Sequence, residues 1–504
     1  MGAERVRPQG PPACRPANGA GILRGMLLTT LLLCALGASP AAPVPNLGAS
    51  QDAGFDARFT GATLRFDYHH CGDATHEQIA PDGLRVEGPW PGSRTQLVDD
   101  TNLGKYLFEI VDPATNGVVY SRGFASIYGE WETTGEARQQ WRSIHESVRF
   151  PEPREPVLLV LKKRANDGTF RELFAQRVDP GTHFVDRSAL PRTGEVVTVV
   201  ENGSPATKVD LLVLGEGYTA EQGDKFKADL ERLAGVFLEF EPFKSRASDF
   251  NIRGLHVPSD EAGISNPRKD VWRAAPLGLS FNAFDSDRYV LTFANRALRE
   301  AAAQAPYDAL ILLFNDRKYG GGGIFGLWST CAADSSEAPY LFVHEFGHSF
   351  AGLADEYYTS QVSYEDFNQE GVEPWEPNVT ALLDPEHIKW GDLVAADTPI
   401  PTPWKQARYD EASLAYQAKR TELRARGATE AEAEALFDEV RAITGPMLQS
   451  EEHYGAVGAF EGGGYRAKGI WRPEADCIMF TRNPDTFCRV CARGIERVID
   501  LYSR

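Results

Sequence analysis

The chain has 504 residues, of which 42% are hydrophobic and 24% are charged, as is typical of a soluble globular protein. Its formal net charge of −19 at pH 7 argues against nucleic acid and anionic membrane surfaces as partners. The length is ample for two domains that each bury a core of their own.

The N-terminus has the pattern of a secretory signal peptide. An arginine-rich region precedes an apolar run from Met26 to Gly37, which is too short to span a bilayer comfortably. Small residues follow, so we expect cleavage between Gly37 and Ala42 and no membrane insertion of the mature chain. We therefore predict a signal peptide over about residues 1–38, a flexible lead over 39–56, and an exported protein that is secreted or periplasmic.

Residues 57–188 show the period-two pattern of half-buried strands. Apolar side chains alternate in short runs such as the one from Leu64 to Tyr68, and Asn116-Gly117 gives a turn signal. Several short strands at this spacing predict an antiparallel β-sandwich as an accessory domain. We interpret the aromatic and acidic stretch 123–137 as a loop that packs between domains.

A composition rich in Gly, Thr, Asn and Pro near residues 191–206 marks a boundary, and we expect a second domain over 195–504. Continuous apolar runs at Val209–Leu214 and Ala309–Phe314 predict strands that are buried on both faces. Helical patterns alternate with these strands. The fold class we expect is therefore α+β, with an α/β arrangement in the second domain.

A glycine-rich segment, Tyr319-Gly-Gly-Gly-Gly-Ile-Phe325, follows the second of these strands. A phosphate-binding loop would need a helix directly after it and a suitably placed Lys, Ser or Thr, and neither is present. We interpret Gly321, Gly322 and Gly323 as part of an exposed edge strand near the cleft, where a substrate backbone can pair in extended form. A glycine turn with a purely structural role is an equal alternative.

Residues 344–358 carry the chemistry and read His-Glu-Phe-Gly-His-Ser-Phe-Ala-Gly-Leu-Ala-Asp-Glu-Tyr-Tyr. His344 and His348 are four residues apart, so on a helix they project from one face and can bind a zinc ion. Glu345 lies beside them and can act as a general base toward a water that the metal activates. The apolar run 338–343 fits a helix that is buried against a core.

Gly352 interrupts this helix and lets the chain turn back, because glycine adopts positive φ without strain. Asp355 follows three residues later and is the favoured third metal ligand. Glu356 stays an alternative, because one extra residue after His348 shifts the register from the usual HExxHxxGxxH spacing. Both carboxylates could instead orient a ligating histidine without touching the metal.

Residues 403–447 are rich in Ala, Glu, Arg and Lys and differ from their surroundings. Gly427 separates two helical patterns, and Thr429 with Glu432 has the form of a capping box. We predict an inserted helical hairpin, which either rims the cleft, binds another partner or is a charged, solvated element.

Met479 stands before a final helix-like segment and is one of four methionines in the chain. Its position fits a methionine-bearing turn beneath the metal, although an ordinary core methionine is an alternative. Cys477, Cys488 and Cys491 cluster beside it, and a disulfide among them is expected in an exported protein. A second zinc site at these cysteines would lack a fourth ligand in the sequence.

These motifs together resemble the immunoglobulin A (IgA) peptidase family of zinc metallopeptidases, a metzincin-like group. The matching pieces span most of the chain and include 123–131, 214–219, 319–325, the zinc segment, 376–380, 458–465 and 477–491. The resemblance implies a zinc-dependent endopeptidase with a β-rich N-terminal domain and a protein or peptide substrate. It does not imply that antibody is the substrate.

The reaction we expect is hydrolysis of a peptide bond, with one catalytic Zn²⁺ bound by His344, His348 and Asp355 and with Glu345 as the base. The rival interpretations are a zinc amidohydrolase that is not a peptidase and an inactive zinc-binding scaffold or binding module.

Some metzincins place a tyrosine directly after the Met-turn to stabilise the oxyanion, and this chain has Phe480 there. Tyr357, Tyr358 and Tyr465 are the candidates for that role.

Overall fold

The computed structural model describes residues 54–360, 368–484 and 486–504. The predicted signal peptide, its cleavage region and most of the flexible lead lie outside the described residues. In these ranges no helix combines the length and the apolar character that a membrane span requires.

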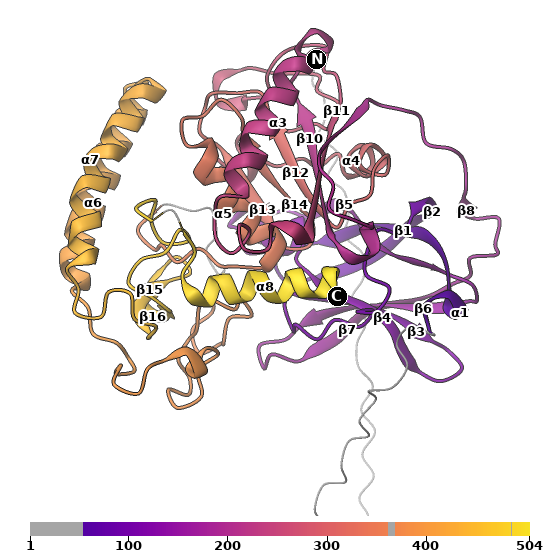
Figure 1. Cartoon of the computed structure of the whole chain (residues 1–504), viewed down its shortest axis with the longest axis horizontal. Helices are drawn as coiled ribbons and strands as arrows, with labels where there is room; N and C mark the ends of the chain where they lie inside the picture. Colours follow the sequence, from indigo (N-terminus) through magenta and orange to yellow (C-terminus); the bar gives the residue numbers. More distant parts are fainter. Residues whose placement is uncertain (1–53, 361–367, 485) are drawn as a thin grey trace, which may run out of the picture. The chain divides into compact units, whose positions relative to one another are not determined.

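The N-terminal part contains two four-stranded sheets (Figure 1). The first has the order β5-β1-β2-β8 and consists of β1 (Phe59–Gly72), β2 (Glu77–Pro89), β5 (Arg142–Pro153) and β8 (Val185–Asp186), after a short helix α1 (Phe55–Arg58). The second has the order β4-β3-β6-β7 and consists of β3 (Tyr106–Asp112), β4 (Gly117–Phe124), β6 (Val157–Arg164) and β7 (Phe170–Val178). Phe66, Phe108 and Leu159 belong to one hydrophobic cluster that both sheets share, as the alternating pattern requires.

A six-stranded sheet follows, with the order β13-β14-β12-β10-β11-β9. Its strands are β9 (Glu195–Val200), β10 (Val209–Glu216), β11 (Phe250–His256), β12 (Ala309–Phe314), β13 (Gly321–Ile324) and β14 (Trp328–Ala332). The four inner strands are parallel, and the edge strands β9 and β13 are antiparallel to their neighbours. Strand β10 is buried along its whole length, as its continuous apolar run predicts.

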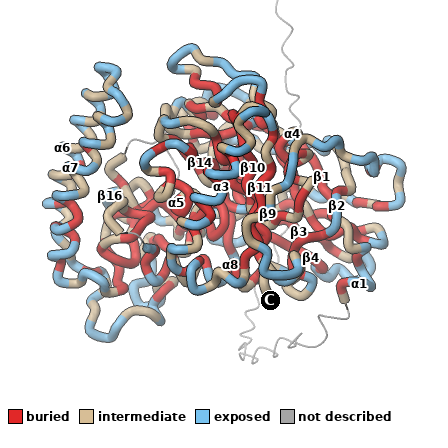
Figure 2. The backbone as a smooth tube through the Cα atoms, turned by 45° about the horizontal axis from the view of Figure 1, so that its top comes forward, coloured by how far each residue is buried: buried red, intermediate tan, exposed pale blue. Residues whose placement is uncertain are grey.

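The helices of this part are α3 (Gly223–Phe237), α4 (Asn295–Ala302), α5 (Ala338–Ala351) and α8 (Arg489–Ser503). Helix α5 packs against β13 and β14 and also contacts α3 and α8. Burial is concentrated in the central strands and around α5, as Figure 2 shows.

The sequence predicts a domain boundary near residues 191–206 and no strand there. In the structure, residues 195–200 form the strand β9. This strand pairs with β11, and its side chains are half-buried or exposed. Four valines in six residues favour a strand, but the flanking Gly, Thr and Pro residues conceal that signal.

Helix α2 (Ile127–Trp131) lies within the stretch 123–137 and connects the N-terminal sheets to the six-stranded sheet. Tyr128 and Trp131 are fully buried in the hydrophobic cluster of the six-stranded sheet, and Ala125 N–H donates to Phe325 O at 2.8 Å. The stretch therefore packs against the six-stranded sheet as predicted, but it forms the helix α2 and a 3-10 turn at Glu136–Arg138 instead of a plain loop. The described residues belong to one compact unit.

The segment rich in Ala, Glu, Arg and Lys forms α6 (Gln406–Ala425) and α7 (Glu430–Gln449), which pack against each other (Figure 1). Thr429 and Glu432 form the predicted capping box, and Gly427 has a φ of 68° at the turn. A two-stranded sheet of β15 (Phe460–Gly463) and β16 (Arg466–Arg472) follows.

Candidate metal centre and cleft

Helix α5 positions the two histidines and Glu345, as the spacing predicts. The helix ends at Gly352, whose φ of 62° and ψ of 31° are left-handed, and Gly352 N–H donates to His348 O at 3.0 Å. This turn returns the chain to the helix and places Asp355 beside both histidines.

Three potential ligand atoms face one another at this place. His344 Nε2 is 3.1 Å from His348 Nε2, and Asp355 Oδ1 is 3.1 Å from the first and 3.3 Å from the second. Two ligands bound about 2.0–2.1 Å from a tetrahedral zinc ion lie about 3.3 Å apart. The three atoms therefore have the spacing of corners of one coordination tetrahedron.

The second nitrogen of each imidazole fixes its tautomer. His344 Nδ1 lies 2.9 Å from Tyr340 Oη and donates to Ile478 O at 3.0 Å, and His348 Nδ1 donates to Leu353 O at 2.5 Å. Since a carbonyl oxygen only accepts, each neutral ring carries its proton on Nδ1 and presents a lone pair at Nε2. Two lone pairs and a carboxylate oxygen repel each other unless a cation lies between them, so these residues fit a metal ion.

The charges of the site support the same conclusion. Burial lowers the pKa of His348, but the adjacent Asp355 carboxylate outweighs this effect and raises the pKa to about 9. Burial alone would raise the pKa of Asp355, yet His348 and His344 hold it well below its usual value. The site thus attracts a positive charge strongly, and a metal ion competes there with a proton.

Glu345 lines the cleft next to the metal centre. Burial raises the pKa of this carboxyl group and Asp355 raises it further, whereas His344, His348 and Arg288 oppose the rise without cancelling it. A carboxylate with a raised pKa is a stronger base, as proton abstraction from water requires.

Arg288 is a cleft residue that sequence reasoning missed, because a single arginine in a loop carries no signal. It donates to Tyr357 Oη at 3.5 Å. Burial lowers its pKa, but Tyr357, Tyr319 and the carboxylates of the site raise it above the usual value. Arg288 is therefore a fixed positive charge beside the metal centre.

The three candidate tyrosines have different surroundings. Tyr465 Oη donates to Asp355 Oδ2 at 2.5 Å, so it holds the carboxylate whose other oxygen faces the histidines. Tyr357 lines the cleft beside Arg288. Tyr358 Oη instead donates to Asp410 of α6 at 2.7 Å, outside the set of residues that line the cleft.

Met479 is fully buried beneath α5. A side chain added at Gly347 would come within 3.4 Å of Met479 Sδ, which shows how closely the two residues approach. The Met479 carbonyl accepts from Glu356 N–H at 2.8 Å. The methionine thus lies under the helix that carries the histidines, and its role as a Met-turn stays a prediction.

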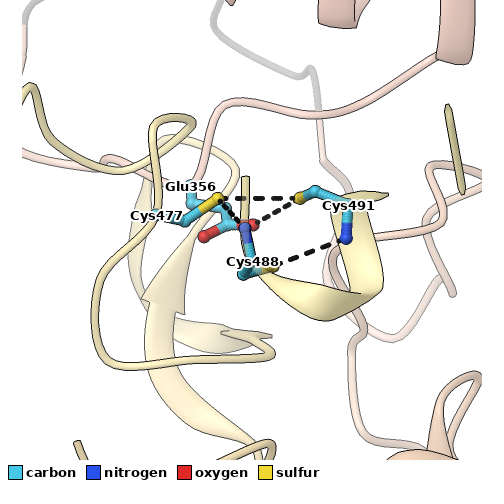
Figure 3. A group of neighbouring side chains, drawn as sticks. All are labelled: Glu356, Cys477, Cys488 and Cys491. Carbon is cyan, nitrogen blue, oxygen red and sulfur yellow. Dashed lines mark hydrogen bonds between the residues drawn. The ribbon is translucent and has the colours of Figure 1, made fainter. Parts of the chain in front are cut away.

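Glu356 does not join the histidines. Its Oε1 lies 3.2 Å from Cys491 Sγ (Figure 3). The same oxygen accepts from Asn378 Nδ2 at 3.0 Å. Cys477, Cys488 and Cys491 are all free thiols here, and the Sγ atoms of Cys477 and Cys491 are 3.8 Å apart. The disulfide expected among them is not formed in this structure.

Strand β13 is the edge strand expected from the glycine-rich segment, and it lies directly on α5. A Cβ atom at Gly323 would be 2.4 Å from Glu345 O and 2.8 Å from His348 Cβ, so packing requires glycine there. The outer edge is partly occupied, because Gly321 pairs with residues 288–290 and Phe325 O accepts from Ala125. Among the described residues, the outer edge of the segment 322–324 has no strand paired with it.

A cleft of about 590 Å³ contains the metal centre. Residues of three parts line it, among them Lys163 of β6, Gly322 of β13 and Arg420 of α6. Both helices of the hairpin contribute, so the hairpin rims the cleft, as one of the alternatives from the sequence stated.

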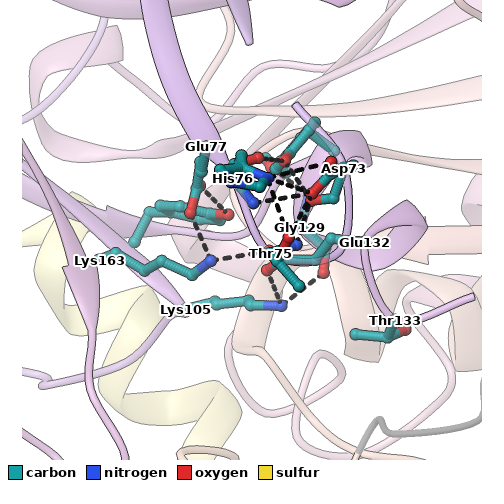
Figure 4. A network of polar contacts seen from close by, with 12 residues as sticks. Asp73, Thr75, His76, Glu77, Lys105, Gly129, Glu132, Thr133 and Lys163 are labelled. Carbon is teal, nitrogen blue, oxygen red and sulfur yellow. Dashed lines mark hydrogen bonds and ion pairs between the residues drawn. The ribbon is translucent and has the colours of Figure 1, made fainter. Parts of the chain in front are cut away.

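On the side of the cleft that the N-terminal part lines, here called the wall, charged side chains form a network of ion pairs and hydrogen bonds (Figure 4). Lys163 Nζ lies 2.5 Å from Glu77 Oε2 and 2.8 Å from Glu132 Oε2. Lys105 pairs with Glu132 at 2.6 Å and donates to Gly129 O at 2.5 Å. These lysine charges are compensated within the wall, which makes the wall a fixed surface beside the metal centre.

Residues 197–499 match the family described as IgA Peptidase M64, and residues 54–175 match the family described as Peptidase M64 N-terminus. The chain belongs to the IgA peptidase M64 family. Comparison with curated proteins gives no match.

Membership of the M64 family makes this protein a metallopeptidase, with a protein or peptide substrate and a metal cofactor. The N-terminal match covers most of the two four-stranded sheets and leaves out β8. The peptidase match begins within β9 and contains the rest of the six-stranded sheet, the metal centre and the hairpin. The resemblance found in the sequence is thus confirmed.

Proposed function

We propose that this M64 peptidase is an exported, zinc-dependent endopeptidase of metzincin type, with an N-terminal β-sandwich as its accessory domain. One observation carries the proposal: the lone pairs of His344 and His348 and a carboxylate oxygen of Asp355 converge at 3.1–3.3 Å beside Glu345. Two imidazoles and one carboxylate are a donor set typical of catalytic zinc. The ion would supply a Lewis acid that polarises the scissile carbonyl and activates water near neutral pH.

Glu345 is the general base in this proposal. It accepts a proton from the attacking water and passes it to the leaving amine. The raised pKa of its carboxyl group suits both steps, because the group must take up a proton and release it again.

Arg288 and Tyr357 line the cleft that contains the metal centre, and we propose that they stabilise negative charge on the carbonyl oxygen. Tyr465 Oη donates to Asp355 Oδ2 at 2.5 Å. It positions the third ligand of the metal.

Cleavage within a chain fits the shape of the site. The cleft extends between the N-terminal sheets, β13 and the hairpin, so a peptide has several walls to contact. Residues 322–324 offer an edge strand on which an extended backbone can pair. The signal-peptide pattern supports export to the periplasm or the medium.

The Glu345→Gln variant tests the proposal. We expect its turnover of a peptide library to fall by about a thousandfold, because the base is lost, while its metal content stays that of the wild type. Cleavage products are identified by mass spectrometry, with a chelated wild-type sample as a second control. Full activity of Glu345→Gln would refute the assigned base. Absence of peptide cleavage by the metal-loaded wild type would favour the amidohydrolase or scaffold interpretation.

A further inference from the structure

Three thiols and one carboxylate gather at the N-terminus of α8 (Figure 3). They belong to Cys477, Cys488, Cys491 and Glu356, and one ligand atom of each lies within 4.8 Å of all the others. All four residues are buried, and none is more than 5% exposed.

We propose that Cys477, Cys488, Cys491 and Glu356 bind a second zinc ion, which has a structural role. Four protein ligands close the coordination sphere, and this distinguishes structural zinc sites from catalytic ones. The sequence shows three of these ligands in one cluster, and the fold supplies the fourth from a segment more than a hundred residues away.

The sulfur–sulfur distance supports a metal and not a disulfide. Cys477 Sγ and Cys491 Sγ are 3.8 Å apart. Two thiolates bound about 2.3 Å from a tetrahedral zinc ion lie about 3.8 Å apart, whereas a disulfide requires about 2.05 Å. Glu356 Oε1 lies 3.2 Å from Cys491 Sγ, which is also close to an edge of such a tetrahedron.

Backbone N–H groups point at the sulfur atoms. Cys488 N–H donates to Cys477 Sγ at 3.2 Å, and Cys491 N–H donates to Cys488 Sγ at 3.4 Å. Cys488 is also the N-cap of α8, where the helix dipole favours negative charge. These contacts stabilise thiolates, the form in which cysteine binds zinc, and zinc binding releases the thiol protons to solvent.

Glu356 provides an independent indication. It is fully buried, and its Oε2 has no hydrogen-bond partner among the residues that the structure describes. A buried carboxylate oxygen without a partner is costly, and a cation bound by this carboxylate removes that cost.

The second ion would brace the first centre. Ile478 and Met479 directly follow Cys477. Ile478 O accepts from His344 Nδ1, and Met479 O accepts from Glu356 N–H. Asp355 precedes Glu356 directly. The cluster therefore holds both the carbonyl that orients one histidine and the backbone that presents the third ligand. This inference does not depend on the identity of the catalytic metal.

The test uses the purified mature protein, loaded with zinc or with Co²⁺. We expect two metal ions per chain by elemental analysis and, with Co²⁺, the charge-transfer absorption of a thiolate complex. Cys491→Ser should lose one ion and this absorption. Cys331→Ser, which changes a buried thiol outside the cluster, should keep both.

The Asp355→Ala variant separates the two sites, because it should lose one ion and keep the thiolate absorption. Absence of peptidase activity from the metal-loaded wild type, with this absorption present, would count against the proposed function only. One ion per chain without thiolate absorption would overturn the second site, as would a native Cys477–Cys491 disulfide in the mature protein.

Wild-type protein provides a measurement that does not require a variant to fold. The three thiols should resist alkylation until a chelator removes the metal, and then react. Equal alkylation rates with and without chelator would overturn the inference.

Discussion

Asp355 and Glu356 are neighbours whose carboxylates lie on different sides of the backbone. Asn378 fixes this arrangement, because its side chain accepts from Ala354 N–H at 2.7 Å and donates to Ala354 O at 2.9 Å. The same amide donates to Glu356. One buried asparagine thus directs one carboxylate to the histidines and the other to the thiols.

Removal of the Tyr465 hydroxyl group should weaken metal binding. Tyr465 Oη donates to Asp355 Oδ2, so Tyr465→Phe leaves the third ligand less well oriented. We expect a loss of about tenfold in metal affinity at the catalytic centre, measured by competition with a chelator. Tyr358→Phe is the matched control, because its hydroxyl group binds Asp410 instead. Equal affinities of both variants would contradict the role of Tyr465.

Glu216, at the end of β10, should make stability depend on pH. The residue is fully buried, and burial raises its pKa to about 7 although backbone N–H groups of Leu277 and Leu279 lower it. The unfolded chain ionises nearer pH 4.5, the ordinary value for glutamate. In the folded state the group binds its proton more tightly, so the free energy of unfolding falls as pH rises from about 4.5 to about 7.

The Glu216→Gln variant stays neutral and should lack this contribution. The free energy of unfolding of the variant, relative to that of the wild type, should rise by on the order of 2–3 kcal/mol between about pH 4.5 and about pH 8. Urea unfolding of both proteins at several pH values measures the difference. A difference that does not change with pH would show that Glu216 ionises normally in the fold.

At the scale of elements, the contact between β13 and α5 determines the shape of the active cleft. The strand lies so close to the helix that Gly323 has no room for a side chain. The glycine-rich segment is therefore structural at Gly323 and available for pairing along the outer edge. The sequence left open a structural glycine segment or an edge strand for a substrate backbone. The first applies to the side of β13 that faces α5, and the second to its outer edge.

Gly323→Ala should push β13 away from α5. We expect a loss of about 1–3 kcal/mol in the free energy of unfolding, together with lower activity, because Glu345 and His348 shift. Gly235→Ala serves as the control, since its Cβ meets nothing within 4 Å on the exposed face of α3 and should stabilise slightly. Chemical unfolding measures both variants. Equal stability of the two would show that the strand accommodates the methyl group.

Local patterns allowed a good part of this fold to be predicted. Helix α5, its glycine turn, β10, β12 and the hairpin follow from periodicity and caps over a few residues. The approach of Glu356 to the cysteines and of Arg288 to the metal centre could not be predicted, because segments distant in sequence meet there. The choice between Asp355 and Glu356 likewise depends on Asn378, which no spacing rule reveals.

At the scale of the whole molecule, charge is unevenly distributed. The chain carries a net charge of −19, yet Arg288 and Arg420 line the cleft. Arg441 and Arg482 line it too, and both pair with Glu337. Burial and the nearby Arg288 together lower the pKa of Arg420 to about 10. Cations close enough to repel each other attract acidic groups of a ligand.

Substrate preference should reflect these arginines. We expect the wild type to favour peptides with an acidic side chain near the scissile bond, and Arg420→Gln to lose several-fold in kcat/KM for them and little for neutral peptides. Arg408→Gln, on the exposed side of the same helix, should change neither. Cleavage of matched acidic and neutral peptides measures the preference. Equal losses for both peptides would indicate a general effect on folding or catalysis.

The bond from His344 Nδ1 to Ile478 O joins residues 134 positions apart and affects the timing of activity. Contacts of such long range form late, after most of the chain has been synthesised. A nascent chain that has produced α5 but not Ile478 holds one imidazole without its orienting carbonyl. Hydrolytic competence is thus postponed until Ile478 has been synthesised, and a growing chain is protected from its own unfinished active site.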